Sequence, residues 1–128
     1  MSLPPMIVII DDDESVRTAT QSLVRSLGFG ASCFESAEAF LGSPLLGAAD
    51  CVISDVQMPG MSGIDLTRHL NARGHATPVI LITAFPEDRI RRQADAAGAF
   101  GFFAKPFDGH TMIECIDRAL STGGAQAN

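Results

Sequence analysis

Five polar side chains stand at the ends of short apolar segments of this sequence. They are Asp11, Asp12, Asp55, Thr83 and Lys105. Adjacent carboxylates repel one another, and a carboxylate taken out of water is costly unless a cation or hydrogen-bond donors compensate its charge. Mg²⁺ binds one or two carboxylates together with water and phosphate oxygens, while an ammonium and a hydroxyl can stabilise a phosphoryl group. The set therefore indicates metal-assisted phosphoryl chemistry, with Asp55 available as a nucleophile that forms an acyl phosphate.

Each of these residues also has an ordinary structural explanation. An acid after a strand commonly caps the next helix, a threonine there is more often structural, and a lysine before proline is usually a surface residue. The functional hypothesis depends on all of them meeting at the carboxyl edge of one sheet, where open α/β sheets bind ligands. We expect Asp13 and Glu14 in the first turn of the following helix, where the dipole favours acids, and not as metal ligands.

Five apolar runs predict the strands of that sheet. They span residues 6–10, 31–34, 51–54, 79–83 and 100–104. The runs are short, do not alternate strictly between apolar and polar residues, and are rich in valine, isoleucine and phenylalanine. This pattern is typical of strands that are buried on both faces of a parallel sheet.

Amphipathic segments follow the five runs and predict five helices. We expect the first to end at Gly28, the second to be capped by Ser36, the third to end near Gly74, and the fourth to run from Pro86 to Gly98. Apolar residues near the C-terminus form the fifth. Strand–helix units with short, right-handed connections predict an α/β fold in which helices cover both faces of a parallel sheet.

Length and composition favour a single soluble domain. The chain has 128 residues, of which 46% are hydrophobic and 19% are charged. No apolar run approaches the roughly 20 residues needed to span a bilayer, and none resembles a signal-peptide core, so we expect a cytoplasmic protein without a membrane partner. A net charge of −6 argues against direct nucleic acid binding by this domain. Three cysteines without CxxC spacing argue against a zinc site or a disulfide framework.

We expect the domain to occupy most of the chain. Residues 1–5 are predicted to be disordered or derived from an expression tag, and residues 6–120 form the domain. Residues 121–128 are small, polar and rich in glycine, which predicts a C-terminal tail or the stub of a linker.

Four motifs together resemble the receiver domain of two-component response regulators. They are "IIDDDESVR", "VISDVQMPGMSG", "LITA" and "FFAKPF", and the resemblance covers residues 6–120. It implies a CheY-like, flavodoxin-like (βα)5 fold, which is a doubly wound five-stranded parallel sheet with strand order 2-1-3-4-5. It also implies a phosphoacceptor signalling domain that promotes its own phosphorylation and dephosphorylation, and not an enzyme.

The resemblance assigns roles to the acidic cluster. Asp55 is implied to be the phosphoacceptor, which receives a phosphoryl group from a sensor histidine kinase in a Mg²⁺-dependent reaction, with Mn²⁺ as a substitute. The implied metal ligands are Asp12, Asp11 acting largely through water, Asp55 itself, and the backbone carbonyl of Gln57. Gln57 and Phe85 stand two residues after the acceptor and the threonine, at positions that tune loss of the phosphoryl group.

The resemblance also implies a conformational switch. Thr83 would move to bind a phosphoryl oxygen, and Lys105 would pair with the phosphoryl group and precede a cis peptide to Pro106. Phe102 stands at the family's rotating aromatic position, although its neighbours make a simple core role an alternative. These changes would alter the surface formed by the fourth helix, the fifth strand and the fifth helix.

The sequence leaves the output of such a domain open. The stretches "ESAEAFL" and "MPGMSG" resemble NarL/FixJ-type regulators, which implies control of transcription through a DNA-binding domain outside this chain. A standalone receiver that acts by protein contact or in a phosphorelay fits the residues as well. A phosphorylation-independent interaction module is the remaining alternative within the family, and a phosphorylation-dependent homodimer is compatible with each reading.

Two classes outside the family fit the residues less well. A haloacid-dehalogenase-type phosphatase would carry a second acid two residues after the nucleophile, where Gln57 stands. A flavodoxin-like cofactor binder would carry a phosphate-binding glycine-rich loop after the first strand, and the sequence there is acidic.

Overall fold

The sheet has the predicted architecture. The computed structural model describes residues 3–126. Its strands are β1 (Met6–Ile10), β2 (Gly30–Phe34), β3 (Cys51–Asp55), β4 (Val79–Thr83) and β5 (Gly101–Ala104). All pairings are parallel, and the strand order is β2-β1-β3-β4-β5. The expected doubly wound five-stranded sheet is therefore confirmed.

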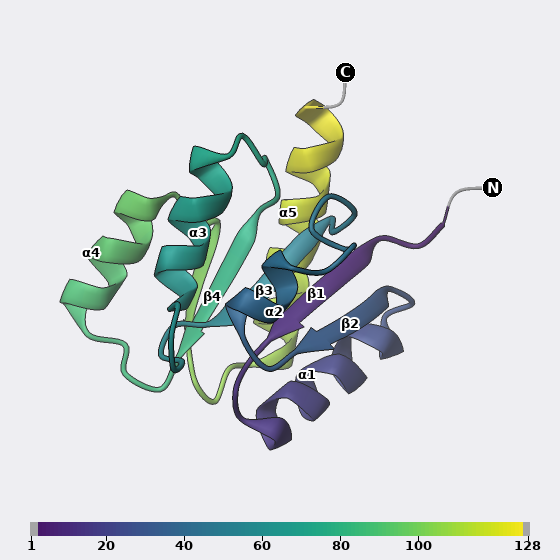
Figure 1. Ribbon diagram of the computed structural model, residues 1–128. Coiled ribbons are helices and arrows are strands. Elements are labelled where there is room, and N and C mark those ends of the chain that lie inside the picture. Colours follow the sequence, from purple (N-terminus) through teal and green to yellow (C-terminus); the bar gives the residue numbers. More distant parts are fainter. Residues whose placement is uncertain (1–2, 127–128) are drawn as a thin grey trace.

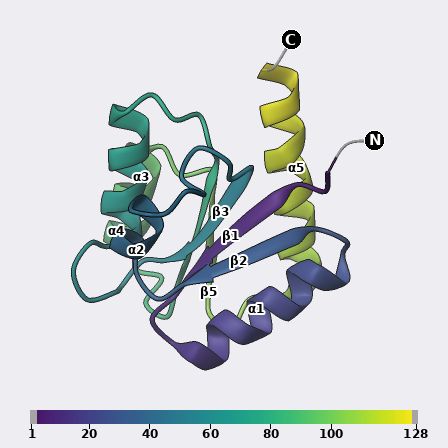
Figure 2. The same ribbon diagram turned by 45° about the vertical axis from the view of Figure 1, so that its right-hand side comes forward.

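Helices cover both faces of this sheet. They are α1 (Glu14–Ser26), α2 (Ala37–Leu41), α3 (Gly63–Ala72), α4 (Asp88–Ala97) and α5 (Gly109–Gln126). Figure 1 shows the chain winding through the sheet, and Figure 2 shows α2, α3 and α4 on one side of the strands with α1 and α5 on the other. None of the helices in this described part of the chain combines the length and the apolar character needed to cross a bilayer.

Two separate apolar clusters lie on the two faces. Side chains alternate in direction along a strand, so neighbouring residues of one strand enter different clusters. In β4, Leu81 packs with residues of α2, α3 and α4, whereas Ile80 and Ile82 pack with residues of α1 and α5. Burial on both faces explains why the strands read as continuous apolar runs in the sequence.

Element boundaries differ from expectation, most clearly at the start of α4 and the end of α5. α4 begins at Asp88 and not at Pro86, because Glu87 is extended (φ −76°, ψ 150°) and its N–H donates to the Phe85 carbonyl at 2.8 Å. Proline fixes φ in a range that suits a tight turn as well as a first helical turn, so its presence did not locate the helix start. α5 continues to Gln126, past residue 120, where the domain was expected to end and a tail or linker stub to begin.

The role of the two terminal segments stays a prediction. Residues 1–2 and 127–128 lie outside the described residues. Residues 3–5 belong to no helix or strand, and the Pro5 carbonyl accepts a hydrogen bond from the Gly30 N–H at 2.9 Å.

The N-terminus of α3 is fixed by a capping box. The Asp65 N–H donates to the Ser62 hydroxyl at 3.0 Å, and the Ser62 N–H donates to the Asp65 carboxylate at 3.4 Å. This arrangement satisfies two backbone donors that a helix start leaves unpaired. It also sets where the loop that follows β3 must end.

We predict that Ser62→Ala lowers the free energy of unfolding by about 1 kcal/mol, because it removes the cap at the start of α3. Urea denaturation monitored by circular dichroism measures the change. Ser22→Ala is the matched control, since Ser22 is an exposed residue inside α1 that caps no helix. Equal stability of the two variants would contradict the capping role.

Candidate functional site

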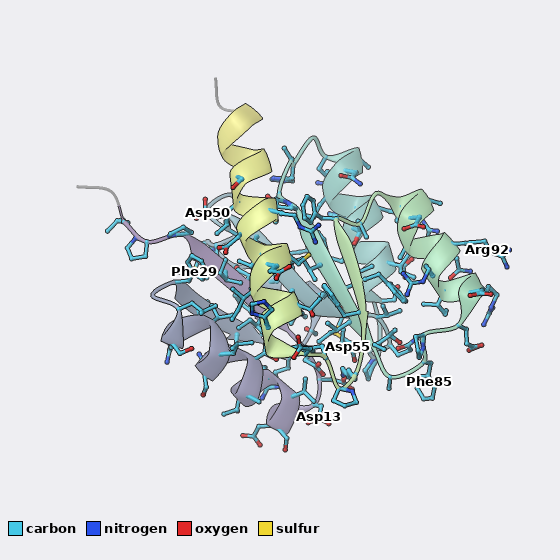
Figure 3. The ribbon with its side chains drawn as sticks, turned by 180° about the vertical axis from the view of Figure 1, so that it is seen from behind. Asp13, Phe29, Asp50, Asp55, Phe85 and Arg92 are labelled. Atoms are coloured by element: carbon cyan, nitrogen blue, oxygen red, sulfur yellow. The ribbon has the colours of Figure 1, made fainter. Side chains whose placement is uncertain are left out.

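The predicted site residues meet at the carboxyl edge of the sheet. Asp11 follows β1, Asp55 ends β3, Thr83 ends β4 and Lys105 follows β5. Because the four strands are parallel, these positions lie at the same edge. Figure 3 shows Asp55 at this end of the sheet, near the start of α1, where Asp13 is labelled.

Three carboxylates form a compact acidic cluster. One oxygen from each of Asp11, Asp12 and Asp55 lies within 4.8 Å of the others. Asp11 is fully buried and Asp55 is 5% exposed, while Asp12 faces solvent. Two buried acids this close together repel strongly, so the cluster requires positive charge nearby.

Lys105 supplies part of that charge. Its Nζ lies 3.0 Å from Asp11 Oδ2 and 3.3 Å from Asp55 Oδ1. Burial lowers the pKa of Lys105, but the hydrogen bond to Asp11 and the charges of both carboxylates outweigh burial and raise the pKa. Lys105 therefore stays protonated, and the peptide bond that joins it to Pro106 is cis.

Asp11 shares its positively charged partner with Asp55. Its Oδ1 accepts a hydrogen bond from the Asp13 N–H at 2.9 Å. Its Oδ2 is buried and pairs with Lys105 Nζ at 3.0 Å, but this ammonium also pairs with Asp55. A buried carboxylate oxygen left in this state, beside two further carboxylates, fits a hard divalent cation such as Mg²⁺.

The environment of Asp55 disfavours its charged form. Burial, followed by the charge of Asp11, raises the pKa of Asp55 to about 6, although the charge and hydrogen bond of Lys105 lower it. Because the pKa stays raised, the positive charge of Lys105 alone does not offset the burial of Asp55 and the negative charge of Asp11. An additional cation would lower the pKa of Asp55 and favour the nucleophilic carboxylate.

The Thr83 hydroxyl is engaged by the loop after β3 and by its own loop. It donates to Gln57 Oε1 at 2.7 Å and accepts from the Phe85 N–H at 2.9 Å. A hydroxyl has one proton to donate, so this proton is committed to Gln57 in the structure.

The loop after β3 is packed closely against the end of that strand. The Gly63 N–H donates to the Val56 carbonyl at 3.0 Å, which closes the base of the loop. A Cβ atom on Gly63 would collide with the Asp55 carbonyl oxygen and would lie 2.9 Å from Leu81 Cδ2. Only glycine therefore allows α3 to start this close to Asp55.

Phe102 packs in an apolar cluster and contacts an arginine of α4. It is half-buried on β5, pairs in register with Leu81 and packs against the cluster formed with α2, α3 and α4. The Arg91 guanidinium carbon lies 4.7 Å from the centre of the Phe102 ring, so an exposed arginine of α4 covers this aromatic side chain.

Sequence reasoning missed some of the contacts that hold the site. Arg17 Nη1 donates to the Asp11 carbonyl at 2.8 Å, and although Arg17 ends the motif "IIDDDESVR", the sequence did not indicate this bond. Asp13, expected in the first turn of α1, is its N-cap and accepts from the Val16 N–H at 3.2 Å. The S-x-x-D spacing at residues 62–65 is a recognisable capping-box signal that could have located the start of α3.

We predict that Asp55→Asn stabilises the metal-free protein, and that the gain increases as pH rises from about 4 to 6. The pKa of Asp55 is raised to about 6 from 3.8, so the folded protein holds its proton more tightly and loses stability as the pH rises through this window. The gain at pH 7.5 should be on the order of 3 kcal/mol, at about 1.4 kcal/mol per pKa unit.

Urea denaturation with EDTA at pH 4.5 and pH 7.5 measures this effect. Asp50→Asn is the control, because Asp50 is exposed and lies at the opposite end of the sheet (Figure 3). If the difference in free energy of unfolding between wild type and Asp55→Asn is the same at both pH values, the pKa of Asp55 is not raised in the folded protein.

Comparison with known proteins identifies close relatives along most of the chain. The family model for the response regulator receiver domain matches residues 7–117. The response regulator protein TodT of Pseudomonas putida is 40% identical over 121 residues, which make up 94% of this chain and 53% of TodT. The transcriptional regulatory protein FixJ of Azorhizobium caulinodans is 36% identical over 125 residues, which make up 98% of this chain and 58% of FixJ.

The fold agrees with these relatives. The crystal structure of FixJ-N superposes with a TM-score of 0.83 at 33% sequence identity, over 94% of this chain and 96% of that one. The chain spans somewhat more than half the length of TodT and FixJ. Sequence, strand order and the match to a whole solved domain agree, and the chain belongs to the receiver domain family of two-component response regulators.

Proposed function

We propose that this domain accepts a phosphoryl group on Asp55 from a phosphohistidine of a sensor histidine kinase, in a Mg²⁺-dependent reaction. The observation that carries the proposal is the contact of Lys105 with both Asp55 and Asp11, next to the third carboxylate of Asp12. This arrangement presents a nucleophilic oxygen beside the positive charge that a phosphoryl group requires.

The chemical step balances with the residues present. A carboxylate oxygen of Asp55 forms a bond to phosphorus while the bond between phosphorus and the imidazole nitrogen of the donor breaks. The electron pair of that bond stays with the imidazole, and a proton from solvent restores the neutral ring. Lys105 stabilises the oxygens of the transferred group, so the domain contributes mainly positioning and charge stabilisation.

The metal site consists of residues at the same edge. Asp12, Asp55 and the backbone carbonyl of Gln57 would hold the ion, with Asp11 acting through water, and Mn²⁺ would substitute for Mg²⁺. When bound, the cation neutralises charge on the carboxylates and on the phosphoryl oxygens. Three adjacent carboxylates with one shared ammonium between two of them support this assignment.

Phosphorylation would change the contacts of Thr83. Its hydroxyl would exchange the Gln57 oxygen for a phosphoryl oxygen, and Phe102 would rotate as the side chain moves. Because Phe102 lies on β5 and Arg91 of α4 covers its ring, this rotation would alter the surface formed by α4, β5 and α5. The mechanism is a local charge change that biases an element with two arrangements.

We further propose that the output is transcription, through a DNA-binding domain outside these residues. FixJ is a transcriptional regulatory protein, and this chain spans only 58% of it. A standalone receiver in a phosphorelay and a phosphorylation-independent interaction module are the alternatives. A phosphorylation-dependent homodimer and a cytoplasmic location stay predictions.

The proposal predicts a mass increase of one phosphoryl group when the protein is incubated with Mg²⁺ and acetyl phosphate. Intact-mass spectrometry measures it. The increase should be absent with EDTA and in Asp55→Asn, and present in the control Asp50→Asn, which changes an exposed aspartate at the far end of the sheet. A folded, Mg²⁺-binding wild type that gains no mass would refute the phosphoacceptor and support the phosphorylation-independent module.

A second prediction concerns Gln57. Gln57→Ala should speed phosphorylation by acetyl phosphate about five-fold, because the Thr83 hydroxyl no longer has to give up one hydrogen bond worth roughly 1 kcal/mol. The substitution leaves the backbone carbonyl in place. Gln93→Ala is the matched control, since Gln93 of α4 lines the same surface cavity as Gln57. An unchanged or slower rate in Gln57→Ala would show that this hydrogen bond does not restrain Thr83.

A further inference from the structure

An acidic side chain of α2 reaches the loop that follows β3. Glu38 Oε2 accepts a hydrogen bond from the Met61 N–H at 2.9 Å, across a sequence separation of 23 residues. Glu38 is exposed and contributes no atom to the carboxylate cluster formed by the residues described above. Its contact is therefore with the backbone of the phosphoacceptor loop and not with the reacting groups.

Gly60 makes room for this carboxylate. It has a φ of +78°, a conformation that residues with a side chain rarely adopt. A Cβ atom at this position would collide with Glu38 Oε2 and would lie 3.5 Å from Oε1. Both carboxylate oxygens therefore lie against the backbone of Gly60 and Met61, which makes a close contact between α2 and the loop.

The loop held in this way carries part of the proposed metal site. Its base is closed by the hydrogen bond between Gly63 and Val56, and Gln57 is the next residue after that base. The middle of the loop is exposed at Pro59 and Gly60. Glu38 thus restrains the far side of this loop at Met61, four residues after the expected carbonyl ligand, with buried Met58 and exposed Pro59 and Gly60 between them.

We propose that Glu38 is a positioning residue, which fixes the loop between β3 and α3 so that the Gln57 carbonyl is held ready for the cation. The inference rests on the proposed function, because the cation is part of that proposal. Its physical basis is preorganisation: a ligand on a restrained loop loses less conformational freedom when the ion binds. A charge-assisted hydrogen bond to a backbone N–H is suited to this restraint.

Two readouts test the proposal on the whole chain. Calorimetry measures Mg²⁺ affinity, because the chain has no tryptophan or tyrosine for a fluorescence titration. Amide hydrogen exchange at Met61 in the metal-free protein reports the hydrogen bond itself. Glu38→Ala removes the acceptor, whereas Glu38→Gln removes the charge and keeps an acceptor oxygen. Glu35→Ala removes an equal charge from an exposed residue that lines the same cavity as Asp12.

We expect Glu38→Ala to bind Mg²⁺ about five-fold more weakly than wild type, and its Met61 amide to exchange faster by a similar factor, as the loss of one such hydrogen bond implies. Glu38→Gln and Glu35→Ala should each stay within about two-fold of wild type in Mg²⁺ affinity, because both keep an acceptor for Met61. The thermal midpoint of Glu38→Ala, measured alongside, separates a loss of affinity from a loss of folding.

Two outcomes would overturn the inference. If Glu38→Ala binds Mg²⁺ no more weakly than Glu35→Ala, the effect is one of charge and not of position. If Met61 exchange is unchanged, Glu38 does not restrain the loop. A wild type that fails to bind Mg²⁺ would instead refute the proposed function, and with it the purpose assigned to Glu38.

Discussion

The structure of the site depends on one ammonium group shared by two buried carboxylates. Lys105 contacts Asp11 and Asp55, and a third acid, Asp12, completes a cluster that remains negative overall. The carboxylates repel one another at this distance, so their own interactions do not hold them together. They are held together by the sheet, whose strands end at one edge because all of them are parallel. The burial of two apolar clusters therefore offsets the repulsion among the acids.

Backbone hydrogen bonds between neighbouring strands continue into the loops that carry the site residues. The ladder continues past the last residues of the strands, since the Lys105 N–H donates to the Thr83 carbonyl at 2.7 Å and the Val56 N–H donates to the Ile82 carbonyl at 2.9 Å. Lys105 and Thr83 are thus fixed at their main chains, while their side chains reach separate partners. Such an arrangement places functional groups on rigid elements and leaves only side-chain rotations free.

The strands could be predicted from the sequence because buried parallel strands appear as apolar runs. The residues at their ends could be predicted as well, because each run is followed by, or ends at, a polar residue. The sequence was not sufficient for contacts between distant segments. Thr83 and Gln57 are 26 residues apart, and Glu38 and Met61 are 23 apart. These pairs depend on side-chain conformations and loop paths that local patterns do not encode. The start of α4 was misplaced for a related reason, since proline suits both a turn and a first helical turn.

Because side chains alternate along β4, Thr83 points to only one of the two helix layers that cover the sheet. Leu81 enters the cluster beneath α2, α3 and α4, and Thr83, two residues later, points to the same face of the strand. Ile80 and Ile82 belong to the opposite cluster, with α1 and α5. A displacement of the Thr83 side chain therefore acts first on one layer of helices, while the other layer rests on different side chains of the same strand. Under the proposed switch, the helix layer that contains α4 would respond to the state of Asp55 before the layer that contains α5.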